Sequence, residues 1–193
     1  MLRLPLSFFE RHTLQVVQDI IGRVLVHESE EGLTSGVVVE AEAYRGEDDP
    51  ASFASKGKTK RSEMLFAPPG RAFVYLTYGM YHLLNIITEK EAFPAAILIR
   101  ALEPREGISL MKERRGREEL KELCSGPGKL CQALGVDLSL NGEEVFSPRS
   151  RLYFTQGKGV RKNLVWRPRI GINEGKDRFW RVYDGDSPFI SAR

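Results

Sequence analysis

The stretch Val37-Val-Val-Glu-Ala-Glu-Ala-Tyr44 decides how this chain is predicted to fold. Its β-branched, apolar composition is typical of a strand, in which successive side chains point to opposite faces. One face therefore carries Val37, Val39, Ala41 and Ala43, and the other carries Val38, Glu40, Glu42 and Tyr44. A half-buried carboxylate costs several kcal/mol of free energy unless it is paired. Two of them on one apolar strand therefore indicate a paired or reactive group.

Arg100 is the natural partner of Glu42. It interrupts the apolar run of a second predicted strand, at residues 95–102, and an arginine inside a buried strand must be paired. We therefore predict that Glu42 and Arg100 meet. From these residues alone, a structural ion pair and a pair that holds a reacting water molecule remain open alternatives.

The other predicted strands come in adjacent pairs. Strands are expected at 24–28, 73–78 and 81–88, with short ones at 151–155, 169–172 and 179–183. Helices are expected at about 7–21, as one helix or as two that break near Thr13, and at 109–123 and 127–134. Strands that follow one another directly favour an antiparallel sheet, hence an α+β fold. No repeat or linker is evident, so we predict a single domain over residues 1–193.

The composition is that of an ordinary globular protein. The chain has 193 residues, 41% of them hydrophobic and 28% charged, with a net charge of +3. No apolar run approaches the roughly 18 residues of a membrane span, and no signal peptide is evident. With only Cys124 and Cys131, both at apolar helical positions, a disulfide framework is excluded and core packing is expected. We expect an intracellular protein that does not bind membranes and has no structural zinc site.

Positive charge is unevenly distributed. Ten Lys and Arg residues lie between 149 and 181, against only Glu174 and Asp177, and a smaller basic group lies at 56–61 within a long polar loop, 45–61. Such clusters can follow a phosphate backbone, but a solvated surface is the commoner explanation. Gly126-Pro-Gly-Lys129 lacks the first glycine and the final Ser or Thr of a Walker motif, so a nucleotide site of that kind is rejected.

The segment Phe73-Val-Tyr-Leu-Thr-Tyr-Gly-Met-Tyr81 is the second clue to function. Tyrosines in strands are commonly core residues. A tyrosine directly before a turn glycine, as Tyr78 is, tends to project from the tip of a hairpin, where it suits insertion between bases. Asn85 lies inside the next apolar strand and must find hydrogen-bond partners there.

These motifs together resemble the alkyladenine (3-methyladenine) DNA glycosylase family. The matching blocks are 39–46, 73–81 with Asn85, 98–104 and 126–134, with Ile20-Ile-Gly22 before them and Arg167-Pro-Arg-Ile-Gly171 after them. Each block is weak alone, but the order and approximate spacing match over essentially the whole chain. The resemblance implies a curved, open-barrel-like antiparallel sheet with several short helices, similar to the C-terminal domain of formyltransferases.

The resemblance also implies an activity: an alkylated purine is turned out of duplex DNA and its N-glycosidic bond is hydrolysed, leaving an abasic site without a lyase step. Glu42 matches the general base that activates water, Arg100 a residue that helps to hold that water, and Tyr78 the inserted tyrosine. The base pocket is matched by Tyr44, Phe53, Tyr75, Asn85, Leu98 and Ile170. Contacts to the DNA backbone are matched by Lys58, Thr59, Arg61, Met80, Tyr81 and Lys129. No metal or cofactor is implied, and a monomer is expected to suffice.

Phe53 departs from the family pattern, which usually has a histidine in the motif that reads Ala51-Ser-Phe53 here. That histidine hydrogen-bonds the flipped base in the family, whereas phenylalanine can only stack. Two readings are open: neutral lesions are poorer substrates, or the loop has a different register and another residue serves.

Two other functions compete with a glycosylase on this sequence. A non-catalytic nucleic-acid-binding module could keep the fold, with Glu42 and Arg100 as a mere ion pair. A small-molecule hydrolase could use Glu40 and Glu42, although the two are only one alternate strand position apart and lack a metal.

Overall fold

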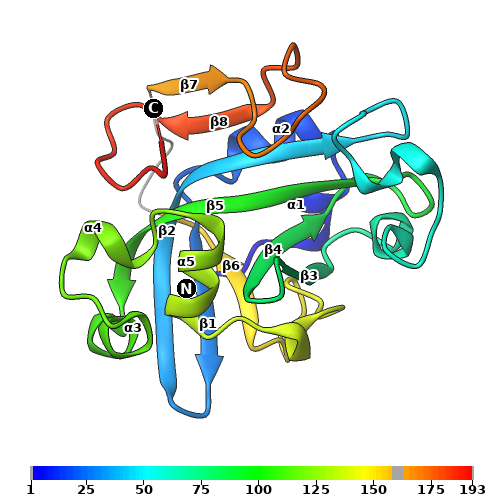
Figure 1. The fold of residues 1–193 in the computed structure, drawn as a ribbon. Coiled ribbons are helices and arrows are strands. Elements are labelled where there is room, and N and C mark those ends of the chain that lie inside the picture. Colours follow the sequence, from blue (N-terminus) through cyan, green and yellow to red (C-terminus); the bar gives the residue numbers. More distant parts are fainter. Residues whose placement is uncertain (1, 158–162, 193) are drawn as a thin grey trace.

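An antiparallel sheet of eight strands forms the frame of the molecule (Figure 1). The computed structural model describes residues 2–157 and 163–192, so positions 158–162 of the predicted basic run lie outside the described residues. The strands are β1 (Val24–Ser29), β2 (Gly32–Arg45), β3 (Ala72–Thr77), β4 (Tyr81–Ile87), β5 (Ala95–Glu106), β6 (Leu152–Thr155), β7 (Leu164–Arg167) and β8 (Arg181–Asp184). With the short helices around this curled sheet, the predicted α+β fold class is confirmed.

The long strand β2 has different neighbours along its length. One edge pairs with β5 over most of the strand. The other edge pairs with β1 over 32–37 and with β8 over Glu40–Glu42. Glu40 and Glu42 of β2 are therefore flanked on one side by β5 and on the other by β8. Each of these two strands carries a buried arginine, Arg100 on β5 and Arg181 on β8.

A double irregularity in the pairing of β2 and β5 corrects one sequence prediction. Val38 pairs with Leu102, Glu40 with Ala101 and Ala41 with Ile99. The first step passes one extra residue of β2, and the second step passes one extra residue of β5. Such bulges shift the alternation of faces. Val38 consequently packs in the core with Ala41 and Ala43, and not on the face of Glu40 and Glu42 as the simple alternation predicts.

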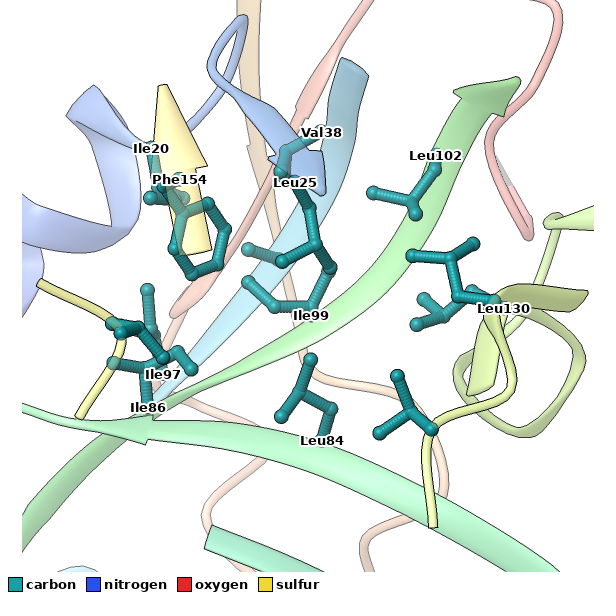
Figure 2. Close-up of a cluster of buried hydrophobic side chains, with 14 of the residues drawn as sticks. Ile20, Leu25, Val38, Leu84, Ile86, Ile97, Ile99, Leu102, Leu130 and Phe154 are labelled. Atoms are coloured by element: carbon teal, nitrogen blue, oxygen red, sulfur yellow. The ribbon is translucent and has the colours of Figure 1, made fainter. Parts of the chain in front are cut away.

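The core lies between one face of the sheet and the helices (Figure 2). Side chains from β1, β2, β4, β5 and β6 converge there with α2 (Thr13–Asp19) and α5 (Pro127–Leu134). Leu84, Ile97, Ile99 and Leu130 are all fully buried in this cluster. Both cysteines lie in it as well, as predicted, and are free.

Three features of the helices and strands either decide between predicted alternatives or differ from the prediction. The N-terminal helix is the broken alternative, α1 (Leu6–Phe9) and α2. The helix expected at 109–123 is two helices, α3 (Ile108–Arg115) and α4 (Leu120–Leu123), because Gly116 adopts a left-handed conformation (φ 59°) that ends α3. The strand expected at 169–172 is absent; β7 ends at Arg167, since Pro168 cannot donate to a sheet ladder.

The segment expected as a loop at 45–61 is not irregular throughout, because it contains the 3-10 helix η1 (Phe53–Lys56). A second 3-10 helix, η2 (Glu63–Phe66), follows it. Among the helices at residues 2–157 and 163–192, none has the length and apolar character to cross a membrane.

Two glycines provide a matched test of the close approach between β2 and the start of α3. Both Gly107 (φ 71°) and Gly116 (φ 59°) are left-handed, but only at Gly107 would a Cβ atom lie 2.3 Å from the Leu33 carbonyl oxygen. We expect Gly116→Ala to lower the free energy of unfolding by about 1–2 kcal/mol through backbone strain. Gly107→Ala should lose a further ~1–3 kcal/mol through overpacking. Urea unfolding measures both, and equal losses would contradict this account of the junction.

Candidate functional site

A cavity of about 740 Å³ opens beside the face of the sheet that carries Glu40 and Glu42. This volume lies within the range of roughly 300–1,000 Å³ that small-molecule sites have. The aromatic part of its wall is formed by Tyr44, Phe53, Phe73, Tyr75, Tyr78 and Tyr81. All six residues predicted for a base pocket line it, namely Tyr44, Phe53, Tyr75, Asn85, Leu98 and Ile170.

Glu42 is fully buried at the edge of this cavity and is held by three donors. The backbone N–H of Ile170 donates to its Oε1 (2.7 Å), while the Tyr44 hydroxyl and Arg100 Nη1 donate to its Oε2 (2.9 and 3.2 Å). The predicted meeting of Glu42 and Arg100 is therefore present. Glu42 does not itself line the cavity, but each of its three hydrogen-bond donors does.

Burial controls the protonation of this group. Loss of water raises the pKa of Glu42 above its usual 4.5, against the opposing effects of Arg100, the Ile170 N–H and the Tyr44 hydroxyl. Burial also raises the pKa of Tyr44 well above 10, with the Glu42 charge adding to the effect. Tyr44 is consequently a hydrogen-bond donor to Glu42 at every pH of interest, and Glu42 keeps a basicity greater than that of an exposed carboxylate.

Arg100 serves both carboxylates of β2. Its Nε donates to Glu40 Oε1 (3.0 Å) while its Nη1 donates to Glu42 Oε2 (3.2 Å). Glu40 also accepts from Arg181 Nη1 (3.1 Å) and from the backbone N–H and hydroxyl of Ser191 (2.6 and 2.9 Å). Neither Glu40 nor Glu42 lines the cavity, and both are fully buried. They differ in their partners, because all three donors to Glu42 line the cavity, whereas of the donors to Glu40 only Arg100 does.

Phe53 and Tyr75 form one corner of the cavity. Their rings meet edge to face with centroids 5.1 Å apart, and the Arg61 guanidinium lies 4.1 Å from the centre of the Phe53 ring. Asn85, which is buried, donates to the Phe73 carbonyl (3.3 Å) and hydrogen-bonds the Tyr75 hydroxyl. The structure thus places Phe53 in the wall of the cavity.

Tyr78 lies at the tip of the β3–β4 hairpin, as its position before Gly79 predicts. Its side chain is 87% exposed, and its backbone has a φ of 51°. A left-handed conformation at a non-glycine residue costs on the order of 1–3 kcal/mol and is typical of functional loops. Exposed Met80 and Tyr81 follow it, so an apolar knob stands at the rim of the cavity.

The residues predicted to contact the DNA backbone divide into two groups. Arg61, Tyr81 and Lys129 line the cavity. Lys58, Thr59 and Met80 are exposed but lie outside its wall. The Thr59 hydroxyl is already hydrogen-bonded to Ser62 (3.0 Å), and Lys58 lies over the Phe66 ring at 5.7 Å.

An ion pair behind the site was missed at the sequence level. Arg169 donates to both oxygens of Asp49 (2.6 and 2.7 Å), and both side chains are fully buried. The Arg169 guanidinium also donates to the Ala43 carbonyl (3.0 Å) and stacks on the Tyr44 ring at 4.7 Å. It therefore anchors both Tyr44 and the loop that presents the Ile170 N–H. In the sequence, Arg169 stood out only as part of the matching block Arg167-Pro-Arg-Ile-Gly171, and nothing marked Asp49 as its partner.

Within residues 2–157 and 163–192, no group of three or more His, Cys, Asp or Glu side chains is arranged to hold a metal ion.

Comparisons with known proteins show which family the chain is similar to. A model of the methylpurine-DNA glycosylase family matches residues 7–188. A protein of Methanocella arvoryzae named "Putative 3-methyladenine DNA glycosylase" is 46% identical over 194 residues, which cover 98% of this chain and 96% of that protein. Proteins with the same name from Carboxydothermus hydrogenoformans and Rubrobacter xylanophilus are 44% and 48% identical, over 98% and 84% of this chain and 99% and 84% of their own lengths.

The ion pair behind the site can be tested against its neighbour. Asp49→Ala leaves a buried Arg169 charge without its partner, so we expect a loss of about 3–5 kcal/mol in the free energy of unfolding. Asp48 pairs with Arg178 at 3.0 Å but its side chain is 77% exposed. Asp48→Ala should therefore cost no more than ~1 kcal/mol. Thermal or urea unfolding of both variants measures these losses. Similar losses in the two variants would contradict the prediction that Asp49→Ala leaves the Arg169 charge buried without a partner.

Proposed function

Because this chain belongs to the methylpurine-DNA glycosylase family, we propose that it removes alkylated purines of the 3-methyladenine type from duplex DNA by hydrolysing the N-glycosidic bond. The observation that carries the proposal is the buried Glu42 carboxylate, held by Ile170, Tyr44 and Arg100 at the edge of an aromatic cavity. A module that only bound nucleic acid would gain nothing from a carboxylate there, since it would repel the anionic backbone.

The proposed reaction is a displacement by water. Glu42 takes a proton from a water molecule in the cavity, and the water oxygen forms a bond to C1′ of the deoxyribose. The C1′–N bond breaks and its electron pair leaves with the base. A cationic alkylated purine leaves as a neutral base, so no strong acid is needed. The carboxylate also stabilises the positive charge that develops on the sugar.

Arg100 has two parts in this proposal. It keeps an opposite charge beside Glu42, which favours the ionised form that can accept a proton. Its guanidinium also lines the cavity, so donors not used by the carboxylates can orient the water molecule. Among the described residues no lysine is hydrogen-bonded to Glu42 or Arg100, and the nucleophile in this proposal is water, so we propose a monofunctional enzyme that leaves an abasic site.

The aromatic wall and the hairpin supply the binding. A purine turned out of the duplex can stack against Tyr44, Tyr75 and Phe53 in the cavity. The exposed Tyr78 can fill the gap in the base stack, and its strained backbone is consistent with a side chain held outward for that purpose. Arg61, Lys129 and Tyr81 at the rim can contact the backbone of the same strand.

The first prediction drawn from the proposed function concerns Glu42. Glu42→Gln keeps the size of the side chain but cannot accept a proton, so release of free base from methylated duplex DNA should fall by at least about 10²–10⁴-fold. Binding to that duplex should be equal or tighter, because a negative charge near the phosphates is removed. Single-turnover base release and a binding titration measure the two effects. Wild-type release in this variant would remove the enzyme assignment and leave a binding module.

The second prediction concerns pH. Glu42 must be ionised to act as a base, so the rate should fall as pH falls through its pKa. Because burial raises that pKa above 4.5, the acidic limb of the single-turnover rate should lie above pH 4.5. After subtraction of spontaneous base loss, a rate that stays on its plateau down to pH 4.5 would contradict the role of Glu42.

The third prediction concerns substrate range. Phe53 can stack on a flipped base but donates no hydrogen bond, so cationic 3-methyl purines should be released much faster than the neutral base hypoxanthine. Phe53→His should raise hypoxanthine release by roughly tenfold, the worth of about one hydrogen bond. Release of the cationic base serves as the internal control. No gain on hypoxanthine would show that Phe53 does not limit the substrate range.

A further inference from the structure

We propose that Glu40 is a positioning residue for base release, which holds the guanidinium of Arg100 in the orientation in which it meets Glu42. The inference rests on the proposed function and extends it to Glu40, the second buried carboxylate of β2. It is carried by how the hydrogen bonds of one buried arginine are divided between two glutamates.

The geometry of Arg100 is the first step. A guanidinium is rigid and planar, so a bond to one edge fixes the direction of the others. Glu40 Oε1 accepts from Nε at 3.0 Å, and Glu42 Oε2 accepts from Nη1 at 3.2 Å. Without the bond at Nε, the side chain could rotate about its long flexible stem and withdraw Nη1 from Glu42.

Glu40 is itself held from two other parts of the chain. Arg181 on β8 donates to Oε1 at 3.1 Å, and Ser191 donates through its backbone N–H to Oε2 at 2.6 Å and through its hydroxyl to Oε1 at 2.9 Å. Arg181 in turn donates from Nε to the Pro168 carbonyl (3.1 Å), two residues before Ile170. The Glu40 cluster thus ties together the strand that carries Arg100 and the loop that carries the Ile170 N–H.

The same cluster sets the charge around Glu42. The charged or titratable groups that face Glu42 are Glu40 and Tyr44 on β2, Arg100 on β5 and Tyr75 on β3, with Arg181 on β8 reaching Glu40. Two carboxylates and two guanidinium groups balance one another. The negative charge of Glu40 raises the pKa of Glu42, and Arg100 lowers it. Removing only the charge of Glu40 should therefore lower the pKa of Glu42.

Two variants of Glu40 separate a positioning role from a purely structural one. Glu40→Ala removes both the charge and the acceptor for Arg100 Nε, and should slow single-turnover base release by roughly 10–100-fold in the folded protein. Glu40→Gln keeps an acceptor for Arg100, so it should restore most of the plateau rate. Its acidic limb should move to lower pH than in the wild type, a change that lost stability alone does not produce.

Glu89→Gln is the matched control. Glu89 is also a largely buried carboxylate in an arginine pair, with Arg45 at 2.6 Å, but it does not line the cavity. This variant should lose stability while its rate constant and its acidic limb stay those of the wild type. Circular dichroism and thermal unfolding show which variants are folded under the assay conditions.

The outcomes are distinguishable from failure of the proposed function. If the wild type releases no base from methylated DNA, the proposed function itself fails. If the wild type releases base and Glu42→Gln does not, but folded Glu40→Ala has the wild-type rate and pH profile, only this inference is overturned. If Glu40→Ala does not fold, the Glu40→Gln profile decides: an acidic limb that has not moved overturns the inference, and one at lower pH supports it.

Discussion

The burial of a negative charge at Glu42 is the constraint on which the rest of the site depends. A carboxylate withdrawn from water is tolerated only if donors replace its hydration. Here an ion pair, a phenol and a backbone N–H do so, and they come from three separate segments of the chain. The pairing of β2 with β5 and the loop around Ile170 must both be in place before the charge is satisfied. The Glu42 carboxylate therefore has its full set of partners only in the folded chain.

The pairing of β2 explains how one sheet can supply these partners. Because β1 leaves the edge of β2 after residue 37 and β8 takes it over at Glu40–Glu42, the carboxylates have β5 on one side and β8 on the other. Arg100 and Arg181 are delivered from these two strands. The register shifts between Val38 and Ala41 turn Val38 into the core and leave Glu40, Glu42 and Tyr44 on the opposite face. The irregularity therefore allows an apolar core on one face of β2 and a charged site on the other.

The parts that sequence reasoning predicted are those governed by local pattern. Alternation along 37–44 and the lone Arg100 in an apolar run were enough to predict a paired carboxylate, and Gly79 was enough to predict an exposed Tyr78. The errors arose where non-local pairing decides the outcome. The face of Val38 depends on a bulge whose extra residue is set by the partner strand. The Asp49–Arg169 pair joins positions 120 residues apart in the chain and has no local signature. Proline at 168 was a local signal for the end of a strand that the prediction overlooked.

The charge balance of the buried cluster bears on which bases the cavity can favour. Glu40 and Glu42 are offset by Arg100 and Arg181, so the cluster as a whole is close to neutral, and of its four members only Arg100 lines the cavity. On the proposed function, a purine would stack against the rings of Tyr44, Tyr75 and Phe53, although the Arg169 and Arg61 guanidinium groups already lie over the Tyr44 and Phe53 rings. A cationic base would depart easily once its bond to the sugar weakens, because it leaves as a neutral molecule. A neutral base would find no donor at position 53. The proposal therefore assigns selectivity mainly to the stability of the departing base, with the carboxylate contributing to every substrate alike.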